Sequence, residues 1–153
     1  MPKTLPTAPL TPAWPPDPQV APYTYTLFCP PLETSPRIAR DFVASVLRSR
    51  RLDGLVDSAA LCTSELVTNA CVHAVGVGSL VWLSVVASGV RVTVYDGAPD
   101  DLPVMREGYD AESGRGLWLV DAMSGGRWGS GPGAPFGGGG ARTGKGVWFE
   151  LRT

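Results

Sequence analysis

The sequence predicts an α+β domain, in which helices and strands are mixed along one chain. Three observations predict this class. Side chains alternate along residues 23–29, which is the period-two pattern of a strand. Apolar residues recur at helical spacing over residues 35–54 and 56–74. Residues 80–87 and 90–95 are rich in valine and are separated by a Ser-Gly pair, which is typical of a tight β-hairpin.

The first helix is expected to have Ser35 as its N-cap and Pro36 at the first helical position, and to end at Gly54. The second helix has a broad surface of alanine, leucine and valine, so it is expected to be largely buried. The apolar side of the first helix consists of Ile38, Phe42, Val43, Val46 and Leu47.

The last third of the chain is expected to hold one more helix and two more strands. The short helix covers residues 116–123, one strand begins at residues 127–128, and a closing strand covers residues 147–151. Residues 97–113 are polar and predict a lid-like loop, while residues 131–145 predict a Gly-rich loop.

The length of 153 residues suits a single domain, so one site is expected. Residues 23–153 form this domain. Residues 1–22 carry eight prolines and few apolar side chains, which predicts a disordered Pro-rich arm. A featureless tail is favoured over a Pro-rich ligand for some partner. The prolines are Pro2, Pro6, Pro9, Pro12, Pro15, Pro16, Pro18 and Pro22.

The charge pattern argues against nucleic acid and anionic membranes as partners. The formal net charge is -1, and the short cluster of Arg48, Arg50 and Arg51 fits the C-terminus of a helix. The longest apolar stretch, residues 80–87, is far shorter than the ~20 residues that span a bilayer. A cytoplasmic protein is expected.

The three cysteines are expected to be buried, reduced thiols. Cys62 and Cys71 lie nine residues apart on one helix, on opposite faces, and Cys29 lies alone in a strand. No spacing of cysteine or histidine resembles a zinc site.

The second helix carries one charged side chain, Glu65, between Ser58 and Val75. Because a buried carboxylate is costly unless it is paired or solvated, something should face it. Asn69 lies four residues later, so both side chains point into the same space. A carboxylate suits a water or hydroxyl nucleophile, and an amide oxygen suits Mg²⁺. For the pair taken alone, a solvent-exposed polar stripe is the alternative.

Two further segments can face a ligand. Asp96 directly follows the strand at residues 90–95, where a side chain can look into a cleft, although a plain turn with Gly97 is the alternative. Residues 114–116 (GRG) open the short helix. Free backbone N–H groups at the positive end of a helix dipole suit phosphates.

The order and spacing of these segments resemble the GHKL superfamily of ATP-binding domains, related to histidine-kinase ATPases, over roughly residues 23–152. Residues 65–70 (ELVTNA) look like the N box, residues 96–99 (DGAP) like the G1 box and residues 114–117 (GRGL) like the G2 box. The compact form and the closing GVWFEL segment resemble the anti-sigma-factor serine/threonine kinase branch, especially its actinobacterial members. This resemblance implies the Bergerat fold, a two-layer α+β sandwich with a mixed, mostly antiparallel sheet and about three helices on one face.

The resemblance also implies a role for each residue. Glu65 would accept a proton from an attacking hydroxyl, Asn69 would bind Mg²⁺, and Asp96 would accept the adenine amino group. The backbone of the G2 box would close on the phosphates, and Arg115 would touch either a phosphate or solvent. The implied cofactors are ATP and Mg²⁺, and the implied site consists of Glu65, Asn69, Asp96, Gly97, Gly114, Arg115, Gly116 and Leu117.

The G1 box departs from the family pattern. Ala98 and Asp100 stand where relatives have glycines, and Gly97 can supply flexibility one position early. Lys145 can reach a phosphate across the pocket or be solvated. His73 is expected to be a packed or capping residue rather than a catalytic one.

The function implied by the resemblance is an ATP-dependent protein serine/threonine kinase. Its substrate would be an anti-sigma-factor antagonist of the STAS type, and it can also hold a sigma factor. A homodimer is compatible with the resemblance. A second hypothesis is a nucleotide-gated binding module, in which ATP orders the lid without phosphate transfer. A third is a structural relic that has lost nucleotide binding.

Overall fold

The computed structural model describes residues 23–73, 78–86, 88–97, 115–132 and 144–153. The expected arm at residues 1–22, the lid-like loop after Gly97 and residues 133–143 of the Gly-rich loop lie outside these ranges. The described helices and strands are, in chain order, β1 (Thr24–Cys29), α1 (Ser35–Ser49), the 3-10 turn η1 (Asp53–Leu55), α2 (Val56–His73), β2 (Ser79–Val86), β3 (Gly89–Asp96), α3 (Arg115–Ser124), β4 (Trp128–Pro132) and β5 (Lys145–Arg152).

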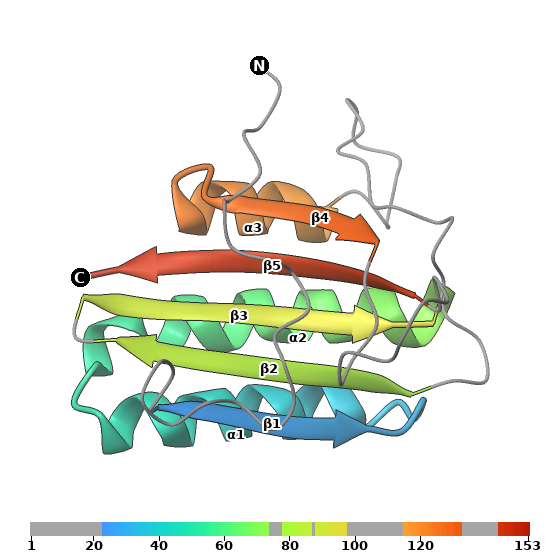
Figure 1. The fold of residues 1–153 in the computed structure, drawn as a ribbon, viewed down its shortest axis with the longest axis horizontal. Coiled ribbons are helices and arrows are strands. Elements are labelled where there is room, and N and C mark those ends of the chain that lie inside the picture. The colour runs from blue at the N-terminus through green and yellow to red at the C-terminus, as the bar shows by residue number, and fades with distance from the viewer. Residues whose placement is uncertain (1–22, 74–77, 87, 98–114, 133–143) are drawn as a thin grey trace.

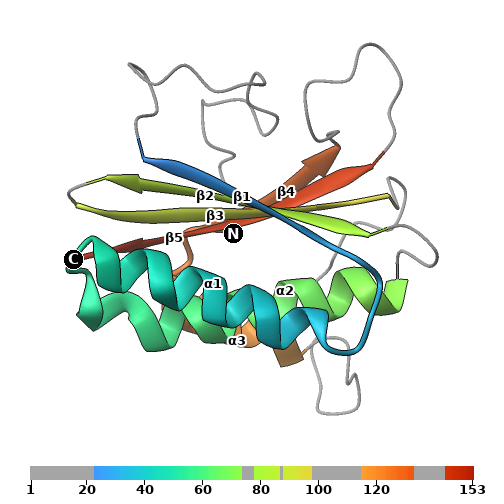
Figure 2. The ribbon, with the colours of Figure 1, turned by 90° about the horizontal axis from the view of Figure 1, so that it is seen from below.

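The strands form one sheet in the order β1-β2-β3-β5-β4, seen face-on in Figure 1. Helices α1, α2 and α3 all lie on one side of it (Figure 2), so the two-layer α+β class is confirmed in its coarse form. All four ladders between the described strands are antiparallel. The mixed sheet was therefore the wrong expectation. The consecutive strands β4 and β5 pair directly, and β5 also runs opposite to β3 on its other side.

The main core lies between the sheet and the helices. Because side chains alternate along a strand, every second residue of β2, β3 and β5 faces the helices, and these positions are apolar except at the strand ends, where Ser79, Asp96 and Lys145 stand. Burying each such side chain contributes about 1.5–3 kcal/mol. The predicted burial of the second helix is also confirmed. The core residues from these strands and from α2 include Val81, Leu83, Val85, Val90, Val92, Val94, Val147, Phe149, Leu151, Val56, Ala59, Cys62, Leu66, Val67 and Ala70.

The start of α1 differs from the expected cap. Thr34 occupies the N-cap position, without a side-chain cap hydrogen bond, and Ser35 is the first helical residue. The hydroxyl of Ser35 instead donates to the Pro30 carbonyl at 2.6 Å. Ile38, expected on the buried side, is 54% exposed. The buried side of α1 is formed by smaller residues, which let the helix approach the sheet and α2: Ser35, Ala39, Val43, Ala44, Val46 and Leu47.

The end of α1 comes before the expected glycine. The N–H of Arg51 donates to the Arg48 carbonyl at 3.0 Å, and that of Leu52 donates to the Leu47 carbonyl at 2.9 Å. This pair of bonds is a Schellman motif, in which one residue takes a left-handed conformation. That residue is Arg51, with φ of 58°. Gly54 lies beyond the end of α1, within η1.

The remaining predicted elements are found with small changes in their bounds. β4 and β5 take in the ends of the expected Gly-rich loop, since β4 ends at Pro132 and β5 begins at Lys145. The three arginines near residue 50 do lie at a helix C-terminus, as the charge pattern predicted. No helix among the described ranges is long and apolar enough to cross a membrane.

Candidate functional site

The polar edge of α2 presents the pair singled out from the sequence. Leu66 and Val67 are buried against the sheet, whereas Glu65 and Asn69 are half-buried. Both therefore lie at the margin of the packed face, one helical turn apart. The exposed Thr68 between them donates its hydroxyl to the Ser64 carbonyl at 2.7 Å, so it is occupied by the helix backbone.

Glu65 lies against the beginning of α3. A Cβ added to Gly116 would lie 2.8 Å from Oε2 of Glu65 and 3.4 Å from its Cβ. A side chain here would displace the Glu65 carboxylate. The backbone at the first turn of α3 thus approaches the carboxylate closely, on the positive end of the helix dipole. The structure brings together two residues that the sequence placed in separate motifs, 51 positions apart along the chain.

The start of α3 is held in place from within the core. Leu117 is 1% exposed and belongs to the main core cluster, so it anchors the first turn rather than lining an open surface. Arg115 is the first residue of α3. Gly114 lies outside the described residues.

Asp96 forms a buried ion pair that the sequence did not predict. It is the last residue of β3 and lies opposite Lys145, the first residue of β5. The Lys145 ammonium lies 3.1 Å from Oδ1 and 3.0 Å from Oδ2 of Asp96. The exposed fractions of the two residues are 7% and 5%. Lys145 was expected to meet a phosphate or solvent, and in this structure it meets a carboxylate.

No local signal reveals this pair. Asp96 and Lys145 are 49 residues apart, and only the register of β3 against β5 places them side by side. A lysine directly after a Gly-rich stretch suggests a solvated residue when it is considered from the sequence alone.

The ion pair lies at the end of the sheet where β3 ends and β5 begins, and α2 runs towards that end (Figure 1). Glu65 lies in the middle of α2. Gly97 follows Asp96 as a half-buried bend at this end. The arrangement puts a carboxylate beside a helix N-terminus, an amide one turn further along α2, and a buried ion pair on the sheet.

The described side chains contain no cluster of three or more His, Cys, Asp or Glu that could hold a metal ion by itself. Asn69 alone would provide one oxygen ligand. Mg²⁺ is commonly bound by one or two protein oxygens together with substrate phosphates and waters, so a site of this kind needs no protein cage.

Cys62 lies three residues before Glu65 on α2 and keeps its thiol protonated. Burial and, to a smaller extent, the negative charge of Glu65 together raise the pKa of the Cys62 thiol to about 12. Cys62 is therefore a neutral core residue at physiological pH. All three cysteines are free; Cys29 and Cys62 are buried as expected, whereas Cys71 is only half-buried.

A scan of the sequence against models of known protein families gives no match, and a search of curated proteins finds no relative.

Proposed function

We propose that this chain is a GHKL-type domain of the Bergerat fold that binds Mg-ATP and transfers the γ-phosphate to a serine or threonine of a partner protein. The observation that carries the proposal is the contact of Glu65 with Gly116. It sets a carboxylate beside backbone N–H groups at the start of α3, which is where phosphates would bind.

The lack of a side chain at Gly116 also supports a nucleotide. A phosphate would meet bare backbone at the start of α3, beside the Glu65 carboxylate. Asn69 would hold Mg²⁺, and ATP would supply the phosphoryl group. Glu65 would accept the proton of the attacking hydroxyl. In phosphoryl transfer, positioning and charge neutralisation account for most of the catalysis.

The partner is inferred from the resemblance to the anti-sigma-factor kinase branch. We therefore propose an antagonist protein of the STAS type as the phosphate acceptor, and a sigma factor as a second protein that this domain can hold. These partners, and the cytoplasmic location that goes with them, rest on the N, G1 and G2 motifs.

One observation favours a second candidate function, a binding module that transfers no phosphate. Asp96 would have to accept the adenine amino group, yet both its oxygens are within hydrogen-bond distance of Lys145. With Lys145 in this position Asp96 is already paired, which favours a nucleotide-gated module, in which ATP binding changes the affinity for a partner without phosphate transfer.

Calorimetry with Mg-ATP separates these candidates from a relic that binds no nucleotide. We expect saturable binding to the full chain, and loss of its Mg²⁺ dependence in Asn69→Ala. Absence of binding at millimolar nucleotide would end both nucleotide proposals. Unchanged Mg²⁺ dependence in the variant would assign the metal to another ligand.

Labelled ATP with a candidate antagonist protein tests the kinase function. We expect Glu65→Gln to lower phosphate transfer by about 10²–10⁴-fold, the usual contribution of a general base, while nucleotide binding persists. Asp57→Asn is a matched control, because it removes an exposed carboxylate from the first turn of the same helix. Undiminished transfer in Glu65→Gln would remove Glu65 as the base.

A further inference from the structure

The described sheet has β1 at one edge and β4 at the other, and the two edge strands differ in chemistry. β4 has five residues, two of them glycines, and ends at Pro132. Short length and proline protect an edge strand against pairing with another chain. β1 has six residues, and none of them is charged, proline or glycine. The β1 edge therefore lacks the usual protection.

The backbone of β1 directs part of its polar groups away from the sheet. The N–H of Val85 donates to the Tyr23 carbonyl at 3.0 Å, so these opposed residues form a hydrogen-bonded pair. Such pairs alternate along an antiparallel ladder, and Tyr25 therefore bonds to β2 as well. By the same alternation, the N–H and C=O groups of Thr26 and Phe28 point outward. In the described sheet no strand lies beyond β1 to pair with them.

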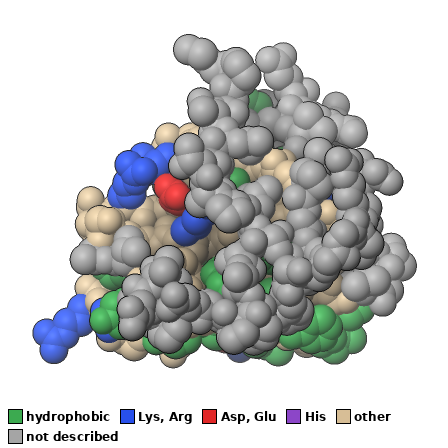
Figure 3. Space-filling view, in the orientation of Figure 1, with side chains coloured by type: hydrophobic (Ala, Val, Ile, Leu, Met, Phe, Trp, Pro, Cys, Tyr) green, Lys and Arg blue, Asp and Glu red, His purple; other side chains and the backbone are tan. Residues whose placement is uncertain are grey.

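Large apolar side chains are exposed along this same edge. Phe28 is 62% exposed and Tyr25 is 39% exposed, on opposite faces of β1. In Figure 3, hydrophobic side chains gather at the lower right margin, on the side where β1 lies in Figure 1. Arg50, whose guanidinium carbon lies 3.7 Å from the centre of the Tyr23 ring, borders this surface at the start of β1. Five of the nine exposed large hydrophobic residues in the described ranges lie in β1, beside it or at the start of α1: Tyr23, Tyr25, Phe28, Leu32 and Ile38.

Helix α1 lies at the same edge as β1, in the second layer of the molecule (Figures 1 and 2). The side of α1 that faces α2 is identified by an open hollow, which Arg37 and Arg40 line together with Thr68 of α2. The opposite flank of α1, away from α2, is a stripe at helical spacing that carries no charge. The stripe consists of Ile38, Phe42, Ser45 and Ser49. Strand and helix thus form one uncharged surface along this edge.

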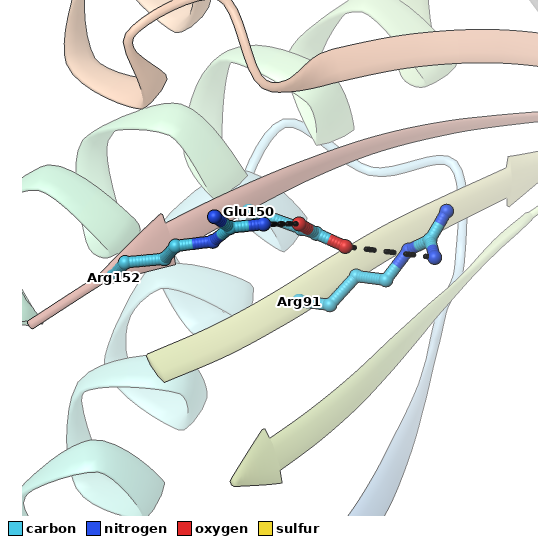
Figure 4. A network of polar contacts seen from close by, with 3 residues as sticks. All are labelled: Arg91, Glu150 and Arg152. Atoms are coloured by element: carbon cyan, nitrogen blue, oxygen red, sulfur yellow. Dashed lines mark ion pairs between the residues drawn. The ribbon is translucent and has the colours of Figure 1, made fainter. Parts of the chain in front are cut away.

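A charged network on the outer face of the sheet lies away from this edge. Glu150 of β5 lies 3.7 Å from Arg91 of β3 and 3.5 Å from Arg152, as Figure 4 shows. Together with Ser84, these residues line an open hollow of about 480 Å³. β3 is two strand spacings, about 10 Å, from β1. Exposed charges at that distance are largely screened by physiological salt, so the network does not repel a chain that pairs with β1.

We propose that β1 pairs antiparallel with β1 of a second copy of this chain, which joins the two five-stranded sheets into one continuous sheet. A two-fold axis through Thr26, perpendicular to the sheet, pairs the whole of residues 23–29 with the same residues of the partner. Each Thr26 N–H then donates to the Thr26 carbonyl of the partner subunit. Both helix layers lie on one side, so the uncharged flank of α1 faces its counterpart. A two-fold interface must be self-complementary, and this edge meets the requirement because no like charges oppose each other.

Disulfide trapping in the full-length chain tests the pairing and its register. In a hydrogen-bonded antiparallel pair the Cα atoms lie about 5.5 Å apart, which suits a disulfide. We expect Thr26→Cys to form a covalent dimer with oxidised glutathione, in a Cys71→Ser background that removes the half-buried native thiol. Thr24→Cys is the matched control on the same face of β1, because its two copies would lie more than about 13 Å apart. No dimer from Thr26→Cys, or equal yields from both variants, would overturn the proposal.

Sedimentation equilibrium measures the pairing without a crosslink. We expect the parent chain at micromolar concentration to have twice its mass of 16.1 kDa. Thr26→Pro removes an N–H that does not bond to β2, a position where an edge strand tolerates proline. Each dimer then loses two hydrogen bonds, so the dissociation constant should rise by about 10–100-fold while the circular dichroism spectrum is unchanged. A parent chain that stays monomeric would refute the pairing.

A second variant leaves β1 untouched. Ile38→Glu places a charge on the flank of α1, opposite its counterpart in the partner, so we expect the dimer to weaken at low salt. Met123→Glu is the matched control, because Met123 is also an exposed apolar residue but lies on α3, away from β1. Equal dissociation constants for the two variants would contradict the proposed two-layer contact.

Discussion

At the scale of single residues, Asp96 and Lys145 form a buried ion pair in the candidate site. Both charged side chains are buried away from water, so each charge is stabilised by the other. Lys145→Met removes the cation but keeps most of the apolar stem. We expect the free energy of unfolding at pH 7 to fall by about 3–5 kcal/mol, the usual cost of breaking a buried pair. Urea denaturation would measure it.

The double variant Asp96→Asn with Lys145→Met is the control for this prediction. It removes both charges, so most of the lost stability should return. If Lys145→Met alone were no less stable than the parent chain, the buried pair would not be an important interaction. Calorimetry on the same variants would show whether Lys145 opposes nucleotide binding at Asp96.

A second prediction at the scale of residues follows from the contact between Gly116 and Glu65. A methyl group at Gly116 would lie 2.8 Å from the carboxylate, closer than van der Waals contact permits. We expect Gly116→Ala to lower the free energy of unfolding by about 1–3 kcal/mol and to displace Glu65. Gly54→Ala is the matched control, because no atom lies within 4 Å of its added Cβ. Equal stability of the two variants would contradict the close approach.

At the scale of elements, α1 is followed by a residue in a strained backbone conformation. Arg51 takes φ of 58° at a position where glycine is usual. We expect Arg51→Gly to raise the free energy of unfolding by about 1 kcal/mol, because glycine has no Cβ to clash in this conformation. Thermal denaturation would measure it. Arg51→Ala keeps the strain and should bring no such gain; an equal gain in both variants would point to the charge instead.

The local elements could be predicted because each has a short-range pattern. Period-two alternation identified β1, the Val-rich pair identified β2 and β3, and helical spacing identified the buried side of α2. The ends of α1 were predicted less well. The end of α1 has no glycine in the left-handed position, and its signal was the apolar pair of Leu47 and Leu52 around the Schellman motif.

The arrangement of the candidate site could be predicted only in part. Glu65 and Asn69 share a helix, so their proximity follows from spacing. The approach of Gly116 to Glu65 and the pairing of Asp96 with Lys145 depend on how distant elements pack. A single sequence carries no local record of strand order or register, so neither contact had a signal.

At the scale of the whole molecule, the sheet has two buried faces with different chemistry. The helix side is almost entirely aliphatic, whereas the opposite face combines aromatic rings with a charged network. The candidate nucleotide site lies at one end of the sheet, where Asp96 is found. The hollow beside Ser84 lies near the opposite end, where β1 begins.

Alkaline pH should destabilise the whole domain, because two buried groups resist losing their protons. The ordinary pKa of Cys62 is 9.0, and burial raises it to about 12 in the folded chain; burial also raises the pKa of Tyr95. The folded chain thus binds more protons than the unfolded chain above pH 9. The stabilisation is fully present below pH 9, and it is lost as pH rises towards 12, at most about 1.4 kcal/mol per pH unit for the thiol. Urea denaturation at pH 8, 9, 10 and 11 would measure this slope. Cys62→Ala should make the slope shallower, and an identical slope in that variant would show that the thiol does not contribute.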